Sequence, residues 1–93
     1  AGKDEEAAAL YESGLRRFPA DARLANSAGN FHARARRDGR AADLFERALR
    51  LDPALHEAAI NLAIVLLRLG RPRPAADVLA RHEVGLSSKA RYW

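Results

Sequence analysis

The strongest constraint on this chain is an internal repeat. When the sequence is shifted by 34 residues and compared with itself, small residues fall on small ones and large apolar residues on large ones. A short unit that repeats in this way cannot bury its apolar face alone, so it stacks on its neighbours. The corresponding sets are Ala7, Ala41 and Ala75; Ala8, Ala42 and Ala76; Leu10, Leu44 and Val78; Tyr11, Phe45 and Leu79; Leu15 and Leu49; Pro19 and Pro53.

Composition indicates what the repeated unit is made of. Alanine and leucine, two of the best helix formers, are frequent, and β-branched residues are almost absent before Ile60. The predicted fold class is therefore all-α, a superhelix of antiparallel helix hairpins. The 93 residues hold one such domain, with no cysteine for a disulfide framework or a thiolate zinc site.

No apolar run approaches the ~20 residues that span a membrane, and no signal peptide is visible. We expect no membrane insertion and a cytoplasmic location.

Breaker and capping residues divide the chain into five helices and the beginning of a sixth. Gly39 and Gly70 are expected to end the helices before them, and Ser87 or Ser88 to cap the sixth helix. The residue 34 positions before Gly70 is Arg36, so the second helix is expected to be longer by about a turn and the third shorter. The expected helices cover residues 4–18, 21–37, 40–51, 54–69 and 74–84.

The residues at matching positions carry a recognisable motif. A small residue is followed four positions later by an aromatic one and then by a proline: Ala7, Tyr11 and Pro19, then Ala41, Phe45 and Pro53. With its 34-residue period, this pattern resembles the second helix of the tetratricopeptide repeat (TPR) family. Leu62-Ala63 and Ala28-Gly29 fall where the family's first helix carries Leu-Gly, and Trp93 where it carries Trp. The resemblance implies a half repeat at 1–19, repeats at 20–53 and 54–87, and the start of a further repeat at 88–93.

The motif also has a physical basis. Two helices approach closely only where one presents a small side chain, so Ala41 and Ala75 are predicted contact points. The aromatic residues, Phe45 and Tyr11, are predicted to fill the wider gap between hairpins.

The resemblance implies a concave face, lined by first helices, that binds a protein or peptide partner. Asparagine and arginine side chains on that face can hold a peptide backbone or a carboxylate. The predicted partner-binding residues are Arg23, Asn26, Asn30, Arg34, Glu57, Ile60, Asn61, Ile64, Arg68 and Arg91.

One subfamily clamps a C-terminal carboxylate with Lys, Asn, Asn, Lys and Arg. Asn30, Asn61 and Arg91 match three of these positions, whereas Asn26 replaces the first lysine. A carboxylate clamp and a general peptide groove both stay open, as does a simple polar face of an amphipathic helix.

Catalytic and metal chemistry find little support. His32, His56 and His82 lie on different predicted helices without a partner histidine at helical spacing, and His32 is expected to be packed. We expect no catalytic residue, no metal, no cofactor and no nucleic acid. Serines 13, 27, 87 and 88 are interpreted as surface or capping residues.

Three alternatives bear on function. The leading hypothesis is a protein-interaction scaffold. The second is a structural or self-association segment of a larger, possibly catalytic, protein. The third is an RNA-binding helical repeat, against which the 34-residue period argues. Both array ends look unfinished, with Leu10, Tyr11 and Leu15 expected to be incompletely covered, so we also predict end fraying or homo-oligomers.

Overall fold

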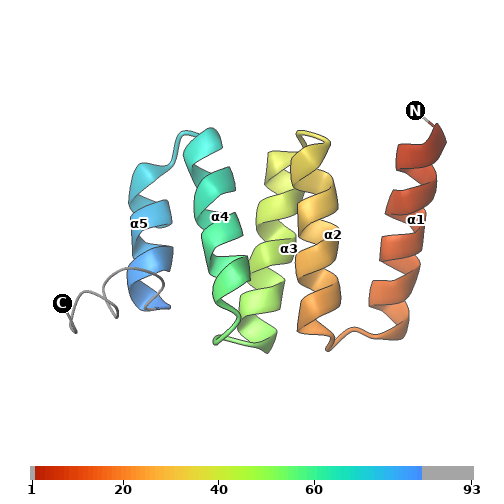
Figure 1. Cartoon of the computed structure of the whole chain (residues 1–93), viewed down its shortest axis with the longest axis horizontal. Coiled ribbons are helices and arrows are strands. Elements are labelled where there is room, and N and C mark those ends of the chain that lie inside the picture. The colour runs from red at the N-terminus through yellow and green to blue at the C-terminus, as the bar shows by residue number, and fades with distance from the viewer. Residues whose placement is uncertain (1, 83–93) are drawn as a thin grey trace.

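Five antiparallel helices form one row in chain order, as Figure 1 shows for the computed structural model, which describes residues 2–82. Each helix packs against the next, and α2 also touches α4. The all-α hairpin array predicted from the sequence is confirmed. The helices are α1 (Gly2–Arg17), α2 (Ala22–Arg34), α3 (Asp38–Leu51), α4 (His56–Arg68) and α5 (Pro72–Arg81).

Local chemistry explains two of the helix starts. The side chain of Asp21 caps α2, because its carboxylate accepts a hydrogen bond from the amide of Leu24 at 3.0 Å. Pro72 occupies the first turn of α5, where a missing amide hydrogen costs nothing. The α5 helix thus begins two residues earlier than expected, with Pro74 inside its first turn.

The predicted break at Gly39 is wrong. Gly39 lies inside α3, and α2 ends at Arg34 instead of extending by a turn. Arg36 takes the left-handed conformation, with φ of 62°, at the position where the following hairpin has Gly70 with φ of 76°. The 34-residue repeat therefore holds in the backbone even where the glycine is replaced.

Both turns close with the same hydrogen bonds. The amide of Arg36 donates to the carbonyl of Ala33 at 3.1 Å, and that of Gly70 to Leu67 at 3.0 Å. One residue further on, Arg37 and Arg71 donate to the carbonyls of the residues five positions before them at 2.9 and 2.8 Å. This is the pattern of a Schellman motif, which satisfies the free carbonyls at a helix end.

The core is built from alanines around one aromatic ring. Ala41 and Ala75 are buried, as predicted, and Phe45 is fully buried. The Phe45 ring packs on Gly29 of α2, so closely that a Cβ placed there would lie 2.5 Å from the ring. The positions 34 residues later carry Ala63 on α4 and Leu79 on α5, so the next hairpin has one methyl group more on the first helix and a smaller side chain on the second.

The first helix is covered better than expected. Leu15 is buried, so the prediction that it would be incompletely covered is wrong. Tyr11 is half-buried against Phe31, with ring centroids 5.5 Å apart, whereas Leu10 is 74% exposed. Leu15 and Tyr11 thus attach α1 to the rest of the array, whereas Leu10 faces solvent.

Side chains of later helices tie the hairpins together. Arg47 of α3 donates to the carbonyl of Pro19 at 3.1 Å, and His82 donates through Nδ1 to the carbonyl of Pro53, also at 3.1 Å. The two prolines are equivalent by the repeat. The predicted sixth helix lies outside the described residues. Among the helices that are described, none has the length and apolarity to cross a membrane.

Candidate functional site

A ladder of amides and a carboxylate joins the predicted site residues of α2 and α4. Asn26 donates through Nδ2 to Oε2 of Glu57 at 3.1 Å, and Asn61 donates to Oδ1 of Asn26 at 3.3 Å. Asn26 is buried, so its amide is used to join the two helices. Of the three, Glu57 is exposed and Asn61 half-buried, and these two retain surface for a ligand.

An open hollow of about 260 Å³ lies between α1 and α2. Two aromatic side chains, Tyr11 and Phe31, provide apolar surface. Asn30, Arg34 and Ser27 provide hydrogen-bonding groups from successive turns of α2. An amide that can both donate and accept, next to a guanidinium, is suited to a peptide backbone or a carboxylate.

A smaller hollow of about 60 Å³ follows between α2 and α4. Asn30 lines both hollows, which makes it the residue that connects them. Phe45 and Val65 reach this hollow from the core, and Asn61, Ile64 and Arg68 border it from α4. The structure thus brings together four of the predicted residues: Asn30, Asn61, Ile64 and Arg68.

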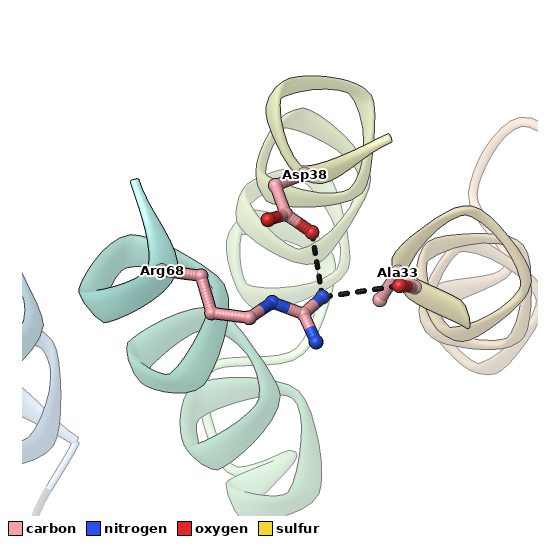
Figure 2. A network of polar contacts seen from close by, with 3 residues as sticks. All are labelled: Ala33, Asp38 and Arg68. Carbon is pink, nitrogen blue, oxygen red and sulfur yellow. Dashed lines mark hydrogen bonds and ion pairs between the residues drawn. The ribbon is translucent and has the colours of Figure 1, made fainter. Parts of the chain in front are cut away.

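Arg68, predicted as a ligand-binding residue, already holds the two hairpins together. Its Nη2 donates to Oδ1 of Asp38 at 2.6 Å and to the carbonyl of Ala33 at 3.1 Å, as Figure 2 shows. The guanidinium therefore sits between the end of α2 and the start of α3, where the helix dipoles favour a cation and an anion respectively. Its other nitrogens stay available, but its geometry is set by this contact.

Of the remaining predicted residues that the structure describes, Arg23 and Ile60 lie apart from the two hollows. Arg23 is exposed in the first turn of α2 and lines neither hollow. Ile60, 43% exposed on α4, lines neither hollow, whereas Ile64, 49% exposed, borders the smaller one. Leu67, 57% exposed, adds a third apolar side chain at helical spacing. Arg91 lies outside the described residues.

Sequence reasoning missed Tyr11, Phe31 and Ser27 as site residues. The repeat predicts Tyr11 in the core, because its position matches that of Phe45, and Ser27 is predicted on the helix surface. Phe31 lies one position after Asn30, and its pairing with Tyr11 follows from the contact between α1 and α2. The period of the repeat predicts which positions are equivalent but not which side chains contact each other. The contact between Tyr11 and Phe31 therefore could not be predicted from the sequence.

Other hollows lie between the second helices. One of about 510 Å³ is bordered by α3, α4 and α5, and one of about 300 Å³ by α1, α3 and the intervening Pro19. Leu15 and Leu49 occupy equivalent places in them, as do Glu12 and Glu46. Charges of both signs line each hollow, which gives neither a clear ligand preference.

The three histidines stay separate. His32 is buried, as predicted, and its Nδ1 has no hydrogen-bond partner among the described residues. Burial lowers the pKa of His32 below its ordinary value of 6.5, and the nearby Arg40 and Arg37 lower it further, with Glu12 acting in the opposite direction. Within residues 2–82, no three metal-ligating side chains come together.

Stacked hairpins with a 34-residue period and a polar face across neighbouring first helices define an α-solenoid built from repeats. The chain belongs to the tetratricopeptide repeat family, whose model matches residues 1–56 and again residues 40–90. Repeats of this family are generically protein-interaction modules. The chain is 35% identical over 83 residues to the peroxisomal targeting signal receptor of Saccharomyces cerevisiae. That match covers 85% of this chain and 14% of the yeast protein.

Proposed function

We propose that this chain is a scaffold that binds a peptide or an extended segment of a partner protein. Binding takes place on the face formed by α2 and α4, with α1 as one wall. The repeats at 20–53 and 54–87 then act as one continuous binding unit. The observation that carries this proposal is the hollow of about 260 Å³ in which aromatic walls meet Asn30 and Arg34.

Each wall has a distinct role in this proposal. Tyr11 and Phe31 contact an apolar side chain of the ligand, because aromatic surfaces gain most from being covered. Asn30 pairs with the ligand backbone, and Arg34 with a carboxylate. Since Asn26 is already bonded to Glu57 and Asn61, recognition centres on Asn30 and Arg34 and not on a clamp that begins at position 26.

A binding role is proposed in preference to a catalytic one. The three histidines, the residues that most often act as general acids or bases, are spread over three places in the array. The yeast relative is named as a receptor for a targeting signal, and a receptor of that kind agrees with recognition of a short segment of another protein. The cytoplasm is the proposed compartment.

Peptide display on this chain tests the proposal. Peptides selected on the parent chain are measured by isothermal titration calorimetry against Asn30→Ala and Arg34→Glu. We expect each variant to weaken binding by about tenfold, because each removes about 1–1.5 kcal/mol of hydrogen bonding to the ligand.

Arg50→Glu, on the exposed side of α3, is the matched charge-reversal control and should bind like the parent. Circular dichroism should show the same helix content for all variants. Selected peptides that bind both site variants as tightly as the parent would move recognition to another face.

A further inference from the structure

Arginines are concentrated along one edge of the row of helices, where two of the turns lie. The turns between α2 and α3 and between α4 and α5 both lie on the edge of the row that is uppermost in Figure 1. Residues 34–40 contain four arginines against one aspartate, and residues 68–74 contain three arginines and no acidic residue. These two segments together carry a formal charge of +6, more than the +4 of the whole chain, so the rest of the chain is net acidic.

Some of this charge is internally compensated and some is not. Arg68 pairs with Asp38, and Arg40 lies 3.6 Å from Glu12. Within the described part of the chain, no ion pair involves Arg36, Arg37, Arg71 or Arg73, and all four are exposed. We call these four residues the arginine edge. Because Arg68 bonds to the first turn, it fixes the two halves of this edge against each other.

One residue of the arginine edge has a backbone conformation that is unfavourable for any residue with a Cβ. Arg36 has φ of 62°, and the equivalent position in the next hairpin is glycine. Since the two turns make the same backbone hydrogen bonds, glycine would serve the fold at Arg36 without the cost that a Cβ brings in the left-handed region. Backbone strain that the fold does not require is typical of functional positions, and this points to a function for the Arg36 side chain.

We propose that the arginine edge is a second interaction surface, separate from the face of α2 and α4, and that it binds an acidic stretch of a partner protein. Guanidinium groups pair with carboxylates through two parallel hydrogen bonds, which suits a segment rich in Asp and Glu. Surfaces for single-stranded nucleic acid add aromatic side chains on which bases stack. The described turns, residues 35–40 and 69–74, carry no aromatic side chain, and this favours a protein partner.

The test compares variants of the full chain for binding to a fluorescein-labelled glutamate-rich peptide, measured by fluorescence anisotropy at low ionic strength. Arg36→Gly should raise the midpoint of thermal unfolding by about 4 °C or more, because the strain is released. The same variant should weaken peptide binding by about twofold to fivefold, the usual worth of one exposed charge pair. Arg37→Gln with Arg73→Gln should weaken it by about tenfold on the same scale.

Arg50→Gln removes the same charge from the exposed surface of α3 and is the matched control. It should bind the peptide like the parent chain. Equal binding by Arg36→Gly and the parent would overturn the proposal, and so would an Arg50→Gln loss as large as that of the edge variants. Tighter binding of an oligonucleotide of the same length, lost in Arg36→Gly, would overturn the protein partner in favour of nucleic acid.

Discussion

Replacing Gly29 by alanine tests the packing of the whole first hairpin. In an ordinary helix interior this change stabilises by about 0.5–1 kcal/mol, because glycine loses more backbone freedom on folding. Here the new Cβ would lie 2.5 Å from one carbon of the Phe45 ring and 2.6 Å from another. The ring is fully buried, so relief requires it to move into the small hollow between α2 and α4.

The expected net effect follows from these two contributions. Overpacking of a well-filled core costs about 1–3 kcal/mol, and the hollow beside the ring allows part of that strain to relax. After the helix gain is subtracted, we expect Gly29→Ala to lower the free energy of unfolding by about 1 kcal/mol. For a domain of this size that is a fall of about 4–8 °C in the thermal midpoint, measured by circular dichroism at 222 nm.

Two controls make the result specific. Gly39 lies in α3, and a methyl group added to it would have nothing within 4 Å, so Gly39→Ala should gain up to about 1 kcal/mol. Phe45→Leu copies the pairing of Ala63 with Leu79 in the next hairpin, and in that background Gly29→Ala should cost nothing or become stabilising. If Gly29→Ala alone stabilises as much as Gly39→Ala, the Phe45 ring does not pack on α2 and the argument fails.

Three further changes probe other parts of the array. Ala41→Leu should cost about 1–3 kcal/mol by overpacking despite the good helix propensity of leucine, and a neutral result in urea unfolding would put Ala41 at the surface. The lowered pKa of His32 means that the unfolded chain binds the proton more readily, so stability is full above pH 6.5 and falls as the pH drops below it. His32→Leu, which copies the equivalent Leu66, should remove this component, and an unchanged slope of stability against pH would contradict it. Arg68→Ala should lower the free energy of unfolding by about 1 kcal/mol, the upper end for an exposed ion pair, whereas an unchanged midpoint in urea unfolding would mark it as an ordinary surface residue.

The row of helices was predictable because the 34-residue period repeats both the helix boundaries and the positions of the buried small residues. The helix end predicted at Gly39 is wrong because glycine is the residue that best adopts the left-handed conformation, whereas the residue that adopts it here is Arg36. A single sequence gives the intrinsic preference of each residue, whereas here the closing hydrogen bonds of the turn outweigh that preference.

The candidate site was less predictable than the fold. Residue spacing placed Asn26 and Arg68 on a shared polar face, and they do lie on α2 and α4. Residue spacing does not predict that the Asn26 amide donates to Glu57 or that one Arg68 nitrogen donates to Asp38. Such pairs join residues about one repeat apart, and their partners depend on how far one helix slides along the next.

The bond from Arg68 to the preceding hairpin bears on how an array of this kind transmits a disturbance. In a one-dimensional stack, each unit feels the rest of the molecule through its nearest neighbour alone. Arg68 grips both helices of the first hairpin at once, the last turn of α2 and the first residue of α3. A ligand that tightens the first hairpin thereby restrains α4, and melting of α4 releases both ends of the first turn. The two hairpins are expected to lose their structure in one cooperative step, with the Arg68 guanidinium adding a polar link to the buried apolar contacts between α3 and α4.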